Sequence, residues 1–127
     1  MLQLTPHMRI LCAVQPVDFR KGIDGLCAVC RQVLKENPFS GAVFVFCNRL
    51  RTSLKVLVYD GQGFWLCQKR LSSGKFSSWP GKQTQETVRE YLVHEVQLLL
   101  WNGNPAQAHA CRLWKPLLPV GAQKAAM

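Results

Sequence analysis

The sequence predicts an α+β fold: one small domain with a mostly antiparallel sheet and helices packed against it. The length of 127 residues fits a single hydrophobic core, and apolar residues make up 48% of the chain, enough to fill one. Short β-type runs occupy the middle of the chain, and helical spacing of apolar residues lies on either side of them. The predicted order is β-α-β-β-β-α, within a domain over residues 1–105. Residues 106–127 are expected to form an extended or partly ordered C-terminal tail.

The first strand and the first helix are predicted before residue 39. Residues 9–14 form a short apolar run closed by Gln15-Pro16, which suits a strand better than a helix. Asp18 can cap a helix whose apolar residues, from Phe19 to Leu34, recur at intervals of three and four. Asn37-Pro38 then ends that helix.

Three β-type segments follow, at residues 42–47, 53–59 and 64–71. The first is continuously apolar from Val43 to Phe46, which is typical of a strand covered on both faces. Asp60-Gly61-Gln62-Gly63 predicts a hairpin between the second and third, because glycine supplies the positive φ that such turns require. The third segment ends on Lys69 and Arg70, so the sheet is expected to have a basic rim.

A loop and a second helix complete the predicted domain. Residues 72–81 have no periodicity and many Ser, Gly and Pro residues, which indicates a surface loop. Thr84 can cap a helix that presents apolar residues from Val88 to Leu99 on one face and stops at residues 102–105.

Charge provides the main indication of function. The chain carries a formal net charge of +9, and such a field attracts polyanions. Asp60 is the only acidic residue between Arg49 and Lys82, and this clustering favours an interaction surface over a general solubility effect. Cations interleaved with aromatic residues suit phosphate contacts combined with base stacking. The predicted nucleic-acid-binding residues are Arg20, Lys21, Arg49, Arg51, Lys55, Lys69, Arg70, Lys75, Phe76 and Trp79.

Two of these groups have a purely structural alternative. Residues 19–25 place two cations and two glycines at a predicted helix start, where backbone amides and the helix dipole favour an anion such as phosphate. Alternatively, the cations are solvated and the glycines let the helix pack closely on the sheet. Phe76 and Trp79 are predicted to be exposed for stacking, but they could instead cap the core.

Catalytic and metal-binding patterns are weak, so no enzyme activity, catalytic residue, cofactor or metal is expected. Cys27 and Cys30 have the spacing of half a zinc site, but without a second pair they are better explained as core positions of a helix. All six cysteines are expected to be free thiols in a reducing compartment. Asp60 followed by Lys69 faintly resembles a metal-dependent nuclease site, although Cys67 stands where such sites carry an acid.

The first ten residues lack the pattern of a secretory signal, and no apolar run reaches the roughly 18 residues of a membrane helix. We therefore expect a cytoplasmic protein without a membrane partner.

Several segments resemble a known family. They are Val17-Asp18-Phe19-Arg20-Lys21-Gly22-Ile23-Asp24-Gly25-Leu26, Asn37-Pro38-Phe39-Ser40-Gly41, Leu54-Lys55-Val56-Leu57-Val58-Tyr59-Asp60-Gly61, Lys69-Arg70-Leu71, Gly74-Lys75-Phe76 and Trp79-Pro80. In this order, over the first two thirds of the chain, they resemble the TnpB-type accessory protein of the insertion-sequence-66 (IS66) family of bacterial transposons. The resemblance implies a role in transposition beside a separate, larger transposase, and a bacterial, nucleoid-associated location. It supplies no catalytic or ligand-binding residues.

Three hypotheses follow for the function. The leading one is a non-catalytic accessory protein that binds DNA, including transposon ends, mainly through phosphate contacts. The second is an adaptor that recruits the transposase through Phe76, Trp79 and the apolar tail. The third is a metal-dependent nuclease that uses Asp60. An open sheet edge also leaves a homo-oligomer among the alternatives.

Overall fold

The sheet and its two helices are seen in a computed structural model that describes residues 8–80 and 86–101. The elements are β1 (Ile10–Ala13), α1 (Ile23–Gln32), β2 (Val43–Cys47), β3 (Ser53–Tyr59), β4 (Phe64–Arg70), β5 (Val88–Tyr91) and α2 (Val93–Leu100). The strands form one sheet in the order β4-β3-β2-β1-β5. β1 and β2 are parallel and the other neighbouring strands are antiparallel. The predicted α+β class and the mostly antiparallel sheet are confirmed.

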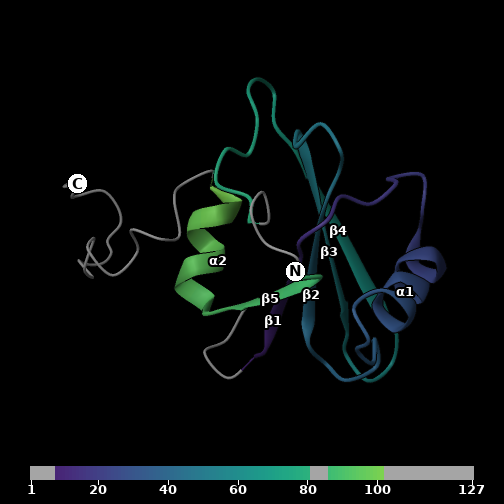
Figure 1. Ribbon diagram of the computed structural model, residues 1–127. Helices are drawn as coiled ribbons and strands as arrows, with labels where there is room; N and C mark the ends of the chain where they lie inside the picture. Colours follow the sequence, from purple (N-terminus) through teal and green to yellow (C-terminus); the bar gives the residue numbers. More distant parts are fainter. Residues whose placement is uncertain (1–7, 81–85, 102–127) are drawn as a thin grey trace.

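The two helices lie on opposite faces of the sheet, so the domain has three layers (Figure 1). α1 buries Leu26, Cys27 and Cys30 in one core cluster, together with Phe44 and Phe46 of β2. α2 places its buried residues in the second cluster, on the other face of the same strands. Both faces of the central strands are therefore covered, which explains why β1 and β2 are apolar at every position.

The first helix begins later than the sequence predicted. α1 starts at Ile23, with Gly22 as its N-cap, so the prediction that Asp18 caps the helix is wrong. The Asp18 carboxylate instead accepts a hydrogen bond from the backbone N–H of Arg20, at 2.9 Å, in a turn that precedes the helix. Aspartate favours such local turns as readily as helix caps, and the sequence pattern does not separate the two.

The second helix is also shorter than predicted. Residues expected in its first turns form β5, which pairs antiparallel with β1 from Val88 to Tyr91. α2 begins only at Val93, and the Glu95 carboxylate accepts the backbone N–H of Leu92 at 2.8 Å. The hydrogen bonds that residues 88–91 form with the edge of β1 therefore outweigh the preference for a helix that the spacing of their apolar residues suggests. The predicted cap at Thr84, the helix stop at residues 102–105 and the tail at residues 106–127 lie outside the described residues.

The cysteines follow the prediction in the part of the chain that the structure describes. Cys12, Cys27, Cys30, Cys47 and Cys67 are free thiols, and only Cys67 among these is exposed. Cys27 and Cys30 are core residues of α1, as predicted from their spacing. Burial raises the pKa of Cys30 to about 12 and that of Cys47 to about 11. No helix within the described ranges has the length and apolar character to cross a membrane.

Candidate nucleic-acid interface

Three segments meet at one end of the sheet: the β2–β3 loop, the stretch after β4 and the stretch between β1 and α1. The N–H of Val17 donates to the carbonyl oxygen of Cys47, at the end of β2, at 3.0 Å. The N–H of Phe76 donates to the carbonyl oxygen of Arg51 at 2.7 Å. We call this end of the sheet the basic end. It is defined by the cations of these segments and of the end of β4: Arg20, Lys21, Arg49, Arg51, Arg70 and Lys75.

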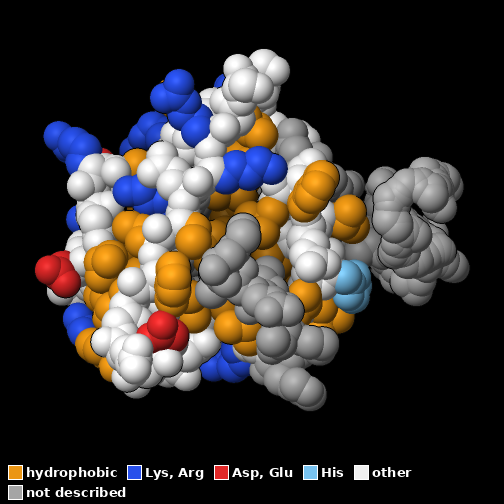
Figure 2. Space-filling model, turned by 180° about the vertical axis from the view of Figure 1, so that it is seen from behind, with side chains coloured by type: hydrophobic (Ala, Val, Ile, Leu, Met, Phe, Trp, Pro, Cys, Tyr) orange, Lys and Arg blue, Asp and Glu red, His pale blue; other side chains and the backbone are white. Residues whose placement is uncertain are grey.

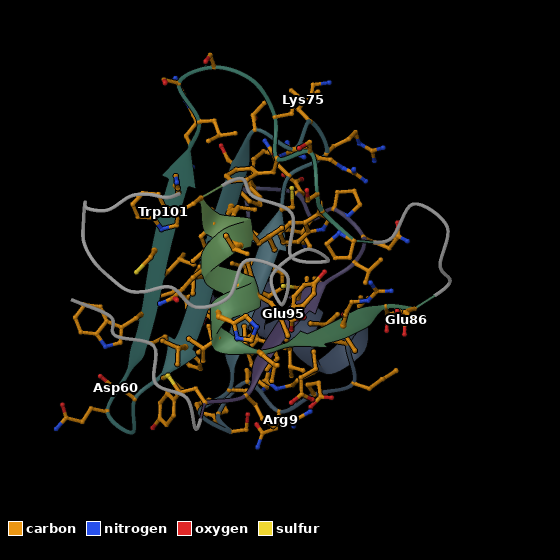
Figure 3. All side chains as sticks on the ribbon, turned by 90° about the vertical axis from the view of Figure 1, so that its left-hand side faces the viewer. Arg9, Asp60, Lys75, Glu86, Glu95 and Trp101 are labelled. Carbon is orange, nitrogen blue, oxygen red and sulfur yellow. The ribbon has the colours of Figure 1, made fainter. Side chains whose placement is uncertain are left out.

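Lys and Arg side chains gather towards the upper part of the molecule in Figure 2. Lys75 lies at the same end in Figure 3, whereas Arg9 and Asp60 lie at the other end. Arg70 pairs with Ser53 at the start of β3, so it is a close neighbour of the β2–β3 loop. Residues separated by up to 55 positions in the sequence thus form one positively charged surface.

Asn48 organises the β2–β3 loop. Its Oδ1 accepts the N–H groups of Thr52 and Ser53, at 2.9 and 3.2 Å, and its Nδ2 donates to the Thr52 hydroxyl at 3.0 Å. The N–H of Arg51 donates to the Asn48 carbonyl oxygen, and Arg51 takes a positive φ of 60°. These bonds hold the loop in one conformation and present the exposed Arg49 to solvent. Sequence analysis missed Asn48, although asparagine is a frequent former of such turns.

The prediction that Phe76 and Trp79 are exposed for base stacking is wrong. Phe76 has no exposed surface and Trp79 is 5% exposed, both within the core cluster under α2. The indole Nε1 of Trp79 donates to the carbonyl oxygen of Val14 at 3.3 Å. The two aromatic residues anchor the loop after β4 to the sheet, and this places the exposed Lys75 beside the β2–β3 loop.

Lys55 is also not available for a phosphate contact. Its side chain is 8% exposed, and its Nζ donates to the carbonyl oxygens of Phe19 and Lys21, both at 3.0 Å. The ammonium group lies 5.0 Å from the centre of the Phe19 ring. Lys55 alternates with Leu54 and Val56 along β3 and therefore faces α1, where the chain covers it. Its role is to hold the segment that carries Arg20 and Lys21.

Arg20 is exposed and paired with an acid. Its guanidinium approaches the Asp18 carboxylate at 2.7 Å, and its side chain is 91% exposed. Hydrogen bonds from Arg20 lower the pKa of Asp18 to about 2. Asp18 therefore balances part of the charge that Arg20 contributes to the basic end.

The start of α1 keeps the backbone amides that a phosphate would need, because no side chain caps it. The alternative role of the glycines, close packing of the helix on the sheet, is wrong for Gly22, since a Cβ there would meet nothing within 4 Å. A Cβ on Gly25 would lie 2.9 Å from the Cβ of Lys21, so Gly25 makes room for the Lys21 side chain, which lines a pocket together with Val29 and Val33. Phosphate binding at this position stays a prediction.

Lys69 lies at the same end of the sheet as Arg70, but on the opposite face. It alternates with Arg70 along β4 and faces α2, where its Nζ donates to the Leu100 carbonyl oxygen at 2.6 Å. The same ammonium group is 5.8 Å from the centre of the Trp101 ring. Lys69 therefore holds the C-terminal end of α2 against the sheet.

An open pocket of about 380 Å³ separates the two exposed segments of the basic end. It is lined by Pro16, Val17, Asp18, Phe19, Asn48, Arg49 and Leu50. One wall comes from the segment before α1 and the other from the β2–β3 loop. The pocket lining includes one acidic residue, Asp18, and one basic residue, Arg49.

Nothing in residues 8–80 and 86–101 resembles a metal centre, since no three His, Cys, Asp or Glu side chains gather there. The Asp60 carboxylate accepts the N–H groups of Gln62 and Gly63, at 2.9 and 3.0 Å, and the Trp65 indole at 2.8 Å. These bonds lower its pKa. Asp60 is thus the turn former of the hairpin, at the opposite end from the cations, and the geometry gives the nuclease hypothesis no support.

The sequence profile of the IS66 Orf2-like protein family matches residues 8–110, which include the whole basic end. The chain belongs to this family. The family's description links the chain to the IS66 insertion sequence, in agreement with the resemblance seen in the sequence.

Two relatives in Sinorhizobium fredii are similar to this chain. The uncharacterized protein y4jC is 43% identical over 75 residues, which cover 59% of this chain and 64% of the relative. The uncharacterized protein y4hO is 40% identical over 83 residues, which cover 65% of this chain and 71% of the relative. The chain thus spans less than two thirds of y4jC. No solved structure matches significantly.

Proposed function

We propose that this IS66 Orf2-like protein is a non-catalytic accessory protein of transposition that binds duplex DNA through its basic end, mainly at phosphates. One observation carries the proposal: cations from four separate parts of the chain converge on one end of the sheet, on loops that the fold holds in place. Proteins hold DNA mainly through such arginine and lysine contacts to phosphate.

The way the cations are positioned favours a binding surface over scattered solubility charges. Arg49 and Arg51 belong to a loop fixed by Asn48, and Lys75 belongs to a loop anchored by Phe76. Lys55 uses its own charge to fix the segment of Lys21. A fixed array loses less conformational entropy on binding than mobile side chains on mobile loops.

Phosphate contacts do not distinguish one base sequence from another directly, so we expect at most a modest preference for transposon ends over other duplexes. Binding should weaken steeply with salt. Neutralising five or six phosphates on a duplex gives a slope of roughly −5 in a plot of log affinity against log salt concentration.

Fluorescence anisotropy with a labelled transposon-end duplex and a scrambled duplex, over a salt series, tests the proposal. The informative variant is Arg49→Gln/Arg51→Asn, because asparagine tolerates the positive φ at position 51. Loss of two phosphate contacts should make the slope shallower by about 2.

The matched control is Arg31→Gln/Lys35→Asn, which removes the same charge from the other end of the molecule. Lys35 also has a positive φ, of 58°, and its neighbour Glu36 pairs with Arg9, at the end away from Lys75. We expect the control to keep the wild-type slope. Equal losses in both double variants would mean that net charge, and not the basic end, determines binding, and no binding at low salt would contradict the proposal.

An adaptor that recruits a transposase is the second candidate, favoured by exposed apolar residues near α2. Leu92 is 63% exposed and Trp101 is 83% exposed. Phe76 and Trp79 are buried and so cannot be its anchors, and the apolar tail lies outside the described residues. Transposase binding that survives nuclease treatment and is lost in Leu92→Ser/Trp101→Ser would support this candidate.

A further inference from the structure

β4 is an edge strand with a row of main-chain groups that no described strand uses. It ends the sheet on the side away from β5, and Figure 3 shows its outer side facing away from the other strands. The N–H of Asp60 donates to the carbonyl oxygen of Gly63, and the N–H of Leu71 donates to the carbonyl oxygen of Thr52. These two hydrogen bonds fix which residues of β4 direct their main-chain groups towards β3. Because the direction of the main-chain groups alternates along a strand, every second residue of β4 turns its N–H and C=O groups outwards: Phe64, Leu66, Gln68 and Arg70.

We propose that β4 pairs antiparallel with β4 of a second copy of this chain, about a two-fold axis beside Cys67. Cys67 is the central residue of the strand Phe64–Arg70, so this register pairs all of β4 with all of its counterpart. The outward groups of Leu66 then meet those of Gln68 in the other copy. The result is one continuous sheet through both copies, with about eight new main-chain hydrogen bonds.

The side chains of β4 fit this register on both faces. On the α2 side, the 45% exposed Trp65 lies opposite Lys69 of the second copy, whose apolar stem can cover the indole. On the α1 side, Phe64 lies opposite Arg70 of the second copy, a pair suited to a cation–π contact. Cys67 meets its own counterpart at the axis, and no like charges face each other.

Other registers are less favourable. A shift of the axis to Gln68 shortens the ladder and leaves Trp65 without a partner in β4, and larger shifts in this direction bring the Lys69 or Arg70 residues of the two copies together. Shifts towards the hairpin shorten the ladder. Cations on an edge strand usually discourage pairing in general, and here their position at one end of the strand selects a single register.

Antiparallel pairing also separates the basic ends. β4 runs towards the basic end in each copy, so the two basic ends point in opposite directions, and the two Arg70 residues lie roughly 20 Å apart along the ladder. That separation exceeds the screening length of about 8 Å at physiological salt, and repulsion between the ends is weak. As a consequence that rests on the proposed function, one dimer could hold two DNA segments.

Edge pairing alone buries little surface, so we expect a concentration-dependent monomer–dimer equilibrium. Sedimentation velocity on the full chain without DNA, over a wide concentration range, detects it independently of the proposed function. Gln68→Pro removes an outward N–H and leaves the β3 ladder intact, and Gln68→Thr is the matched control. Wild type and Gln68→Thr should dimerise, and Gln68→Pro should stay monomeric with an unchanged circular dichroism spectrum.

Crosslinking then locates the axis. In a Cys111→Ser background, Cys67 is the exposed thiol among the described cysteines, so a short bismaleimide should join two chains through position 67. Adding Cys67→Ser should abolish the crosslink. Trp65→Lys places a cation opposite Lys69 and should weaken the dimer at least tenfold, whereas Gln97→Lys on α2, with the same added charge, should not.

Three results would overturn the proposal: a wild-type chain that stays monomeric at the highest concentration, a dimer that survives both Gln68→Pro and Trp65→Lys, or a dimer that gives no Cys67 crosslink. Normal DNA binding by a strictly monomeric chain would refute the dimer and leave the proposed function standing.

Discussion

Lys55→Met tests the most specific consequence of the structure. Lys55 belongs to the cationic stretch of the sequence, yet the structure gives it a role in stabilising the fold and not in binding DNA. Methionine keeps the length and apolar stem of lysine and removes the ammonium group. The variant therefore loses both hydrogen bonds to the carbonyl oxygens of Phe19 and Lys21, and the approach to the Phe19 ring. Everything else near the site keeps its shape.

The magnitude follows from those contacts. A hydrogen bond from a charged donor contributes about 1.5–3 kcal/mol, and the released carbonyl groups of Phe19 and Lys21, near the surface, can regain water. The methionine also avoids the cost of burying an ammonium group. We expect a net loss of about 2–3 kcal/mol in the free energy of unfolding, which lowers Tm by about 10–15 °C in a domain of this size.

Urea unfolding monitored by tryptophan fluorescence measures this loss, with Lys75→Met as the control. The Lys75 side chain is exposed, so any contact it makes is a surface contact, and its substitution should change the free energy of unfolding by less than about 1 kcal/mol. The salt dependence of DNA binding should show the reverse pattern: a slope shallower by about 1 in Lys75→Met and an unchanged slope in folded Lys55→Met. A Lys55→Met variant as stable as wild type, with a shallower slope, would refute the assignment.

Three further predictions concern the loop anchor, an ion pair and thiol reactivity. Phe76→Ala should cost about 3–5 kcal/mol of stability in urea unfolding, because it leaves a cavity at a residue with no exposed surface, and Phe76→Leu should cost clearly less. The Asp18 carboxyl should titrate by NMR near pH 2, and Arg20→Gln should return it towards its usual range. Because the folded pKa is lowered, the stabilisation from this pair is present above about pH 4 and lost as the pH falls towards 2. In a Cys111→Ser background, native protein should react rapidly with maleimide at Cys67 alone; rapid labelling of further thiols would show that the core opens readily.

The sheet was predictable because its strands carry strong local signals. The apolar run of β2 and the Asp60-Gly61-Gln62-Gly63 turn each specify one structure, and the structure has both. β5 was not predictable from local pattern. Its four residues are consistent with a helix turn, and only the edge of β1, which is distant in the sequence, makes them a strand.

The surface proposed to bind DNA was only partly predictable from the sequence. The charge cluster drew attention to the β2–β3 loop and to Lys75, because charge density is visible in the sequence, and their role in DNA binding stays a prediction. The burial of Phe76 and Trp79 was not, since a loop without periodicity gives no sign of which side chains turn inwards. Lys55 did leave a signal: alternation along β3 places it on the same face as the buried Leu57.

The central claim is that the basic end contacts DNA, and backbone NMR chemical-shift changes on titration with a short duplex test it most directly. We predict that the largest shifts occur at residues 19–22, 48–52 and 70–76, and that residues 34–39 and 60–64, at the other end of the sheet, stay unchanged. The shifts should disappear at high salt. Shifts centred on residues 34–39 and 60–64, or spread evenly over the surface, would contradict the assignment of the DNA interface.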